Sequence, residues 1–230
     1  MTPYISVVIP LYNGIEYLNE AIDSVITQTF TEWDLLIGVN GHGLDGGDVY
    51  KKAQVIIESK NSSKIFLKNY QTKGAPMTLN EMVKESKSEW IAFLDADDKW
   101  HPRKLEAHMY AIQKLNPVPD IIGTFCEYFG RMSGNPNIPA NYIHQDIFKQ
   151  YNPMIHSSVL IKANLIDFQD IILYDYDLWC RLSLKDKIFF NIPNKLVYHR
   201  VHDGSYYNSS NKQDPDAVRY HYFGHEGAKN

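Results

Sequence analysis

The residues with the clearest capacity for chemistry are the carboxylates of Asp95-Ala96-Asp97-Asp98, which follow the apolar run Trp90-Ile91-Ala92-Phe93-Leu94. Such a run is typical of a strand buried on both faces, so the carboxylates are predicted at the carboxyl edge of a sheet, where open α/β folds bind ligands. Close carboxylates raise each other's pKa, and a divalent cation with oxygen ligands relieves that repulsion. Asp98 could instead cap a helix entered through Pro102, but a cap needs only one Asp. The stretch therefore favours a metal or phosphate site.

The elements that must position this cluster alternate along the first half of the chain. β-Branched and apolar runs predict strands at residues 5–10, 34–39, 64–67 and 90–94, and helical apolar spacing predicts helices at 14–28, 46–59, 75–86 and 102–115. This alternation predicts an α/β fold with a mostly parallel, doubly wound central sheet and helices on both faces. Polar loops at residues 11–14, 40–43 and 95–98 follow strand ends and should meet along one edge.

The second half is less regular. Strands are predicted at residues 120–129, 154–161, 188–191 and 196–201, a helix at 175–184, and a Gly/Pro/Asn-rich loop at 131–140. The polar stretch from about Asn208 is predicted to be loosely ordered. Without an internal repeat or a clear linker, residues 1–230 are expected to form one domain. Its nucleotide-binding half covers about 1–100, its acceptor-binding half about 101–207, and a polar tail 208–230.

Composition excludes several classes of function. The chain has 230 residues, 44% hydrophobic and 22% charged, with a net charge of -4, which gives no basic footprint for nucleic acid. The 2 cysteines, Cys126 and Cys180, are too few for a disulfide scaffold or a cysteine-based zinc site. No signal peptide and no apolar stretch of about 20 residues is present, so the expected location is the cytoplasm, with peripheral attachment to its membrane face left open.

Four segments, in order along the chain, together resemble family 2 glycosyltransferases. They are Ile5-Ser6-Val7-Val8-Ile9-Pro10-Leu11-Tyr12-Asn13-Gly14, Phe93-Leu94-Asp95-Ala96-Asp97-Asp98, Tyr174-Asp175-Tyr176-Asp177-Leu178-Trp179-Cys180-Arg181-Leu182 and Arg200-Val201-His202-Asp203-Gly204-Ser205. The resemblance implies the GT-A (nucleotide-diphospho-sugar transferase) fold. It also implies inverting transfer of a hexosyl or N-acetylhexosaminyl group from a nucleotide-sugar to a hydroxyl acceptor in glycan or surface polysaccharide synthesis.

The resemblance also assigns a metal site. By match to the family's Asp-x-Asp (DXD) motif, Asp95 faces the ribose and the metal, and Asp97 is the main protein ligand of Mn²⁺ or Mg²⁺. His202 completes the metal shell or reaches the diphosphate, with Ser205 and Arg200 nearby. Hard oxygen ligands suit these cations, and a leaving nucleoside diphosphate needs one to neutralise its developing charge. His199 competes with His202 by proximity, and a solvent-facing His in a polar loop is the simpler alternative.

Proton removal is assigned elsewhere. Inverting transfer needs a general base on the face opposite the leaving group. Asp175 occupies the position of the family's base, with Asp177 as runner-up. Tyr174 stands where the family has Glu, a departure that concerns the acceptor contacts more than the base. An N-cap on the following helix is the structural alternative for Asp175.

The expected nucleotide pocket combines Pro10, Tyr12 and Asn13 of the first loop with Asn40, Lys73 and Ala96. Asn40 replaces an Asp of the family, and its amide can donate as well as accept. A uracil base is expected, with thymine or guanine as alternatives. Tyr12 is expected to stack on the base. The alternative is that its ring packs on the end of the first strand. Lys73 supplies a positive charge near the phosphates in one interpretation and is an ordinary solvated lysine in the other.

Two rival functions stay open from sequence. A non-catalytic nucleotide-sugar or glycan-binding module would explain the altered second and third motifs. A sugar nucleotidyltransferase would require a Gly-rich basic loop after the first strand, which Leu11-Tyr12-Asn13-Gly14 does not provide. The acceptor, whether a glycan, a lipid-linked sugar or another hydroxyl compound, and the oligomeric state are not determined by the sequence.

Overall fold

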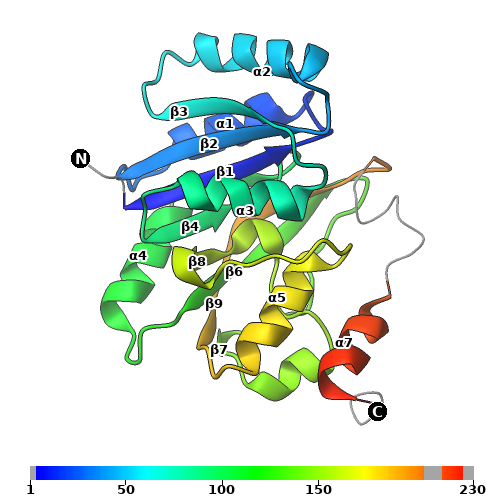
Figure 1. The fold of residues 1–230 in the computed structure, drawn as a ribbon. Helices are drawn as coiled ribbons and strands as arrows, with labels where there is room; N and C mark the ends of the chain where they lie inside the picture. Colours follow the sequence, from blue (N-terminus) through cyan, green and yellow to red (C-terminus); the bar gives the residue numbers. More distant parts are fainter. Residues whose placement is uncertain (1–3, 205–213, 225–230) are drawn as a thin grey trace.

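The computed structural model describes residues 4–204 and 214–224, which form a single nine-stranded sheet flanked by helices (Figure 1). The strand order is β3-β2-β1-β4-β8-β6-β9-β5, and β7 pairs with β9 outside this path. The strands are β1 (Ile5–Leu11), β2 (Trp33–Asn40), β3 (Ile65–Tyr70), β4 (Trp90–Phe93), β5 (Lys99–Trp100), β6 (Ile121–Gly130), β7 (Asn141–Tyr142), β8 (Leu160–Lys162) and β9 (Phe189–Val201).

The helices cover both faces of this sheet. The α-helices are α1 (Leu18–Ile26), α2 (Gly47–Ser59), α3 (Ala75–Glu85), α4 (Lys104–Lys114), α5 (Tyr174–Ser183) and α7 (Pro215–Phe223). Three 3-10 turns accompany them: η1 (Gln145–Lys149), η2 (His156–Ser158) and η3 (Ala163–Leu165).

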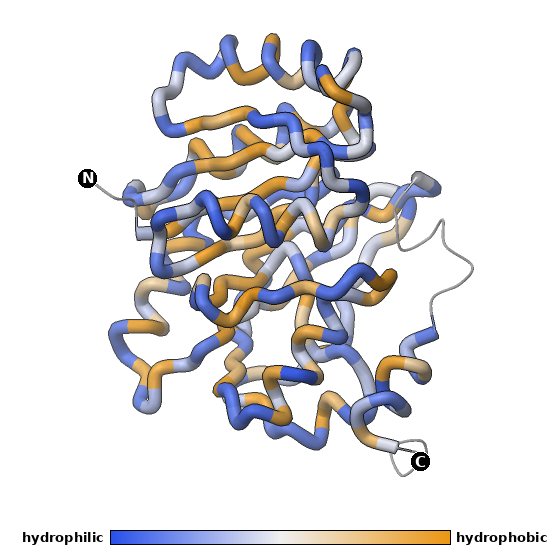
Figure 2. The backbone as a smooth tube through the Cα atoms, in the orientation of Figure 1, coloured by the Kyte–Doolittle hydropathy of each residue, from blue (hydrophilic) through white to orange (hydrophobic). Residues whose placement is uncertain are grey.

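The first half is the parallel α/β unit that the sequence predicts. β1 pairs in parallel with β2 and β4, and β2 pairs in parallel with β3. Along β1, Val7 and Ile9 pack with α1 in one core cluster, whereas the intervening Val8 packs with α3 in the other. Because successive side chains of a strand point to opposite faces, both faces of β1 must be largely apolar, and the buried exception, Ser6, hydrogen-bonds to Ser88. Figure 2 shows this hydrophobic stretch running through the centre of the fold.

The second half mixes strand directions. β8 pairs antiparallel with both β4 and β6, whereas β6 runs parallel to β9. The β6–β9 register shifts on either side of Phe125, so β9 stays continuous where the sequence predicts two strands. β5, which sequence patterns miss, is only two residues long and pairs with β9.

Two other expectations are wrong. Residues 154–161 are not one strand, because the turn η2 occupies residues 156–158 and only Leu160–Lys162 joins the sheet. The prediction of a loosely ordered stretch from about Asn208 fails at Pro215–Phe223, which forms α7, whose side chains Val218, Tyr222 and Phe223 pack on the core cluster that contains α5. The rest of that stretch, apart from Asp214 and Gly224, lies outside the described residues. An apolar stripe on one helix face is enough for docking even where overall polarity is high.

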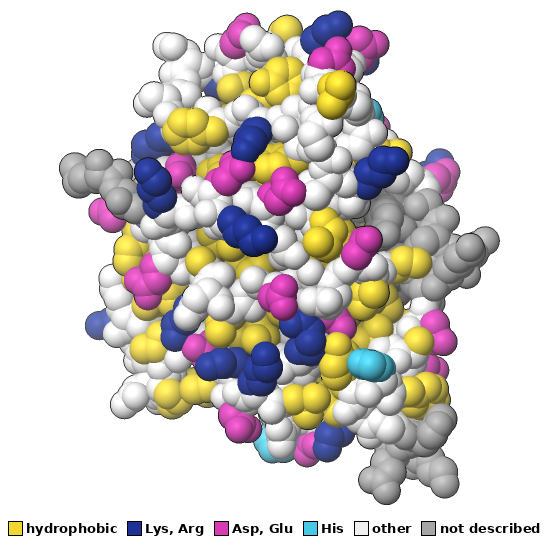
Figure 3. Space-filling view, in the orientation of Figure 1, with side chains coloured by type: hydrophobic (Ala, Val, Ile, Leu, Met, Phe, Trp, Pro, Cys, Tyr) yellow, Lys and Arg dark blue, Asp and Glu magenta, His cyan; other side chains and the backbone are white. Residues whose placement is uncertain are grey.

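The surface is mixed in charge. Figure 3 shows acidic and basic side chains interspersed over the face that carries α3. Within the described ranges, no helix is long and apolar enough to span a bilayer.

Candidate active site

The three predicted polar loops do meet at the carboxyl edge of the parallel strands. His42, in the loop after β2, contacts the backbone oxygen of Tyr12 through Nε2 at 2.6 Å, and the two rings stack with centroids 5.1 Å apart. A Cβ added to Gly14, in the loop after β1, would contact Ala96 at 3.8 Å. The loops after β1, β2 and β4 therefore form one continuous rim.

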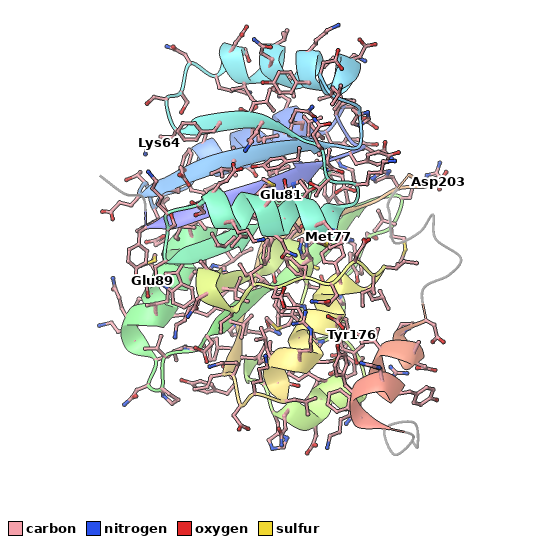
Figure 4. The ribbon with its side chains drawn as sticks, viewed as in Figure 1. Lys64, Met77, Glu81, Glu89, Tyr176 and Asp203 are labelled. Atoms are coloured by element: carbon pink, nitrogen blue, oxygen red, sulfur yellow. The ribbon has the colours of Figure 1, made fainter. Side chains whose placement is uncertain are left out.

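The end of β9 supplies the fourth side of this rim, and Figure 4 labels Asp203 at its outer tip. His202 Nε2 lies 2.9 Å from Asp97 Oδ2, so two segments distant in sequence share one contact. Asp98 lies beneath them, fully buried, where Oδ2 contacts His199 Nδ1 at 2.9 Å and Oδ1 accepts the backbone N–H of Arg200 at 2.8 Å. Helix α4 begins at Lys104 after Arg103 with no side-chain cap, so Asp98 is not its N-cap but a brace for β9.

Asp95 is held from the other side by η2. Ser157 Oγ donates to Asp95 Oδ2 at 3.0 Å and accepts the Asp95 N–H at 3.1 Å, while His156 Nδ1 contacts Asp95 Oδ1 at 3.1 Å. Burial favours the neutral acid, but the neighbouring His156 and the hydrogen bond from Ser157 outweigh it and hold the pKa of Asp95 below its usual value. His156 is itself fixed by stacking on Phe93, with centroids 4.9 Å apart. Asp95 is thus a fixed anion.

Asp97 is electrostatically strained by comparison. Burial, followed by the negative charges of Asp98 and Asp95, raises the pKa of Asp97 to about 6. Its side chain retains 23% exposure, so its oxygens remain accessible from the rim. A cation placed beside Asp97 would remove the repulsion that raises this pKa.

The donor set fits Mn²⁺ or Mg²⁺ held partly by substrate. Within residues 4–204 and 214–224, no group of three or more His, Cys, Asp and Glu side chains is arranged as a self-contained metal cluster. A cation at a diphosphate site takes one or two protein carboxylates and completes its shell with phosphate and water oxygens. The Asp97–His202 pair, with Asp95 beside it, offers that incomplete set.

Asp175 lies in the first turn of α5, half-buried and close enough to His156 and Asp95 to interact with both charges. Burial raises the pKa of Asp175, and the nearby His156 partly offsets this. Asn152 Nδ2 donates to its Oδ2 at 3.0 Å. The helix has no side-chain cap, because Leu173 occupies the N-cap position. Asp175 is therefore not the N-cap of α5.

The runner-up, Asp177, is committed to packing. It is 4% exposed, accepts Arg181 Nε at 2.9 Å, and accepts the Tyr222 hydroxyl of α7 at 2.5 Å. Figure 4 places Tyr176 of the same helix among the side chains between α5 and α7. Both carboxylate oxygens of Asp177 are used within the fold.

The candidate nucleotide pocket contains one unusual residue. Asn40 is 1% exposed, and neither its Oδ1 nor its Nδ2 has a hydrogen-bond partner within the described residues. Tyr12 is 55% exposed at the rim, where a base could stack on it. Asn13 and Lys73 are exposed, Pro10 is half-buried and Ala96 is buried. Ser205 lies outside the described residues.

Ser157, Asn152 and Asp98 hold the candidate site residues in place, a role that the sequence did not predict for Ser157 or Asn152. The polar triplet His156-Ser157-Ser158 within an apolar stretch was the available signal for the first of these. His199, the competitor of His202, faces Asp98 rather than Asp97.

The fold is that of the GT-A class of transferases. Its first half has a parallel sheet, its second half mixes strand directions, and a rim of carboxylates lies at the strand ends. S. aureus TarS 1–349, solved with UDP-GlcNAc, aligns with a TM-score of 0.73 at 16% identity, over 91% of this chain and 61% of that one. The Pyrobaculum calidifontis mannosyltransferase PcManGT, solved with GDP-Man and Mn²⁺, aligns with a TM-score of 0.68 at 14% identity, over 90% and 59%.

The chain belongs to glycosyl transferase family 2, whose model matches residues 6–164. An uncharacterized glycosyltransferase of Methanocaldococcus jannaschii is 29% identical over 92% of this chain and 75% of its own length. The Escherichia coli UDP-Glc:alpha-D-GlcNAc-diphosphoundecaprenol beta-1,3-glucosyltransferase WfaP is 26% identical over 87% of this chain and 78% of its own length. A relative from Rickettsia felis matches 87% of this chain over only 34% of its own length. Glycosyl transfer is the activity for which this family is named.

Proposed function

We propose that this protein is an inverting, metal-dependent glycosyltransferase that uses a UDP-linked sugar and a hydroxyl acceptor in glycan or surface polysaccharide synthesis. The observation that carries the proposal is the 2.9 Å contact between Asp97 and His202. It joins the Asp-x-Asp segment to the end of β9 at the edge where α/β folds bind ligands.

Asp97, Asp95 and His202 are the proposed ligands of Mn²⁺ or Mg²⁺, which would stabilise the negative charge that develops on the leaving diphosphate. The raised pKa of Asp97 supports this role, because a carboxylate destabilised by its neighbours gains most from a cation. Asp95, fixed by Ser157 and His156, would hold its orientation before the donor arrives.

Asp175 is the proposed general base. Burial raises the pKa of Asp175, which makes its carboxylate a stronger proton acceptor than an ordinary aspartate. Its oxygen would take the proton of the acceptor hydroxyl as that oxygen attacks the anomeric carbon, and the nucleoside diphosphate would leave from the opposite face. The bond from Asn152 keeps the carboxylate oriented.

The donor base is inferred from Asn40, and the acceptor class from a named relative. Asn40 presents an unused donor and an unused acceptor, a pattern that the N3–H and O4 of uracil complement. WfaP is named for a UDP-linked donor and a diphosphoundecaprenol-linked acceptor. This supports a UDP donor, a lipid-linked or glycan acceptor, and a cytoplasmic protein that works at the membrane face. We assign nucleotide binding to about residues 1–100 and acceptor binding to about 101–207.

A thermal-shift panel of nucleoside diphosphates with Mn²⁺ tests the proposal. UDP at about 100 times its Kd should raise stability by about 2.7 kcal/mol, which is roughly 5–10 °C in Tm for a chain of this size. UDP without Mn²⁺, and Mn²⁺ with uridine, are the controls. Equal shifts with EDTA would remove the metal from the proposal, and no shift with any diphosphate would remove the donor site. A matching assay follows UDP release from UDP-sugars in Mn²⁺.

A further inference from the structure

We propose that Arg200 is a positioning residue that holds the Asp95–Asp98 loop in its ligand-binding geometry. The resemblance places Arg200 near the expected diphosphate, but the structure uses this side chain within the fold. What the loop binds rests on the proposed function; the clamp on the loop does not.

The guanidinium of Arg200 is enclosed between two aromatic rings. Its Cζ lies 4.3 Å from the ring centroid of Tyr17, which precedes α1, and 4.4 Å from that of Phe129 in β6. Phe129 and Arg200 are register partners in the parallel β6–β9 pair, so the sheet itself sets this stacking. The side chain is 14% exposed. A planar cation fixed on both faces retains only its edge for hydrogen bonding.

That edge points at the loop. Nε donates to the backbone oxygen of Asp97 at 2.9 Å, and Nη2 donates to Glu20 at 3.0 Å. The backbone N–H of Arg200 also donates to Asp98 Oδ1 at 2.8 Å. One residue of β9 therefore holds two consecutive residues of the loop, one through its side chain and one through its backbone.

Tyr17 closes the arrangement. Its ring packs on Arg200 and also lies 5.0 Å from the ring of His202, whose Nε2 contacts the Asp97 carboxylate. The carbonyl of Asp97 is thus fixed through Arg200 and its carboxylate through His202, and both holders rest on Tyr17. Movement of Arg200 would release the carbonyl and let the carboxylate rotate away from the rim.

Lysine cannot reproduce this role, because an ammonium has neither the flat faces nor the Nε–H aimed sideways. Arg200→Lys keeps the charge and tests the geometry. Lys99→Ala is the matched control: Lys99 also pairs with Glu20, at 3.1 Å, and lies 4.8 Å from the Phe129 centroid, but its ammonium bonds to Glu20 rather than to Asp97.

The experiment measures hydrogen exchange of the individual backbone amides of residues 95–98, without ligand, in wild type and both variants. We expect exchange at least 10-fold faster in Arg200→Lys and within twofold of wild type in Lys99→Ala. If Arg200→Lys fails to fold by circular dichroism, Phe129→Leu removes one stacking face and should accelerate exchange of the same amides. Unchanged exchange in the folded variant, or equal acceleration in Lys99→Ala, overturns the proposal.

A second readout connects the clamp to ligand binding. By calorimetry in Mn²⁺, Arg200→Lys should bind UDP at least 10-fold more weakly while its affinity for uridine stays unchanged. Equal losses for both ligands would indicate general disruption and overturn the role. If wild type does not bind UDP, the proposed function fails on its own, and the exchange measurement still decides the role of Arg200.

Discussion

Replacement of Asp97 by Asn should stabilise the metal-free protein while it removes metal-dependent activity. The structure gives the sign, because burial and the charges of Asp98 and Asp95 raise the pKa of Asp97 from 3.8 to about 6. A shift of about two units corresponds to roughly 3 kcal/mol at about 1.36 kcal/mol per unit. Because the side chain is 23% exposed, solvent screening reduces this to about 2 kcal/mol.

The pH dependence follows from the same shift. The folded chain holds the Asp97 proton more tightly than the unfolded chain, so wild-type stability falls as pH rises from about 4 to about 6. Asn cannot ionise. The variant should therefore match wild type near pH 4 and exceed it by about 2 kcal/mol above pH 6–7, or about 4–8 °C in Tm.

The assay is thermal and urea unfolding at pH 4, 6 and 8 in EDTA. Asp98→Asn is the matched control. This variant should destabilise the fold by about 3 kcal/mol, because it breaks the buried contact with His199. Burial lowers the pKa of His199, but the bond to Asp98 is the main effect that raises it to about 9. An Asp97→Asn variant no more stable than wild type at pH 8, or one equally stabilised at pH 4, would refute the reasoning. With Mn²⁺ and UDP present, wild type should become more stable than Asp97→Asn, since only wild type gains the ligand's binding energy.

Three further predictions concern the proposed roles. Asp175→Asn should retain UDP binding but lose transfer by a factor on the order of 10² or more. Asp177→Asn should instead lower Tm, because it releases Arg181 and Tyr222. The pH profile of wild-type kcat/KM should show an acid limb above the ordinary carboxylate pKa of 3.8, because burial raises the pKa of Asp175. Normal turnover of Asp175→Asn would exclude it as the base. Asn40→Asp should raise the preference for UDP over CDP about 10-fold by calorimetry, because a carboxylate accepts the N3–H of uracil but repels the N3 acceptor of cytosine. An amide can rotate to donate to the cytosine N3, so Asn40 discriminates less between the two bases. An unchanged ratio of UDP to CDP affinity would place the base elsewhere. Tyr12→Ala should weaken UDP about 10-fold through lost base stacking, and equal affinity would assign Tyr12 to packing alone.

The parallel half was predictable because its signal is local. β1, β2 and β4 are largely buried on both faces, so they need mostly apolar runs. The polar loops after them must share one edge. Asp95 and Asp97 could be located from that reasoning alone. Asn40 was located in the same way, but its two unused amide atoms are visible only in the structure.

The second half resisted pattern reasoning for identifiable reasons. Residues 154–161 have strand composition, yet Ser157 and Ser158 turn the chain so that Ser157 can bond to Asp95. β5 is stabilised by its pairing with β9, because two residues carry no periodicity of their own. α7 follows polar sequence, and its docking depends on the few apolar side chains that pack on the core cluster containing α5.

By itself the sequence determined the alternation of strands and helices, the carboxylates at a strand end and the family to which the chain is similar, because these depend on residue order and local periodicity. Only the tertiary structure decided how the carboxylates differ. Asp95 is fixed by η2, Asp97 contacts His202, Asp98 braces β9, and Asp177 is tied to α7 while Asp175 is not. The physical reason is that a carboxylate's charge and freedom depend on burial and on partners up to about a hundred residues away, which no local pattern encodes.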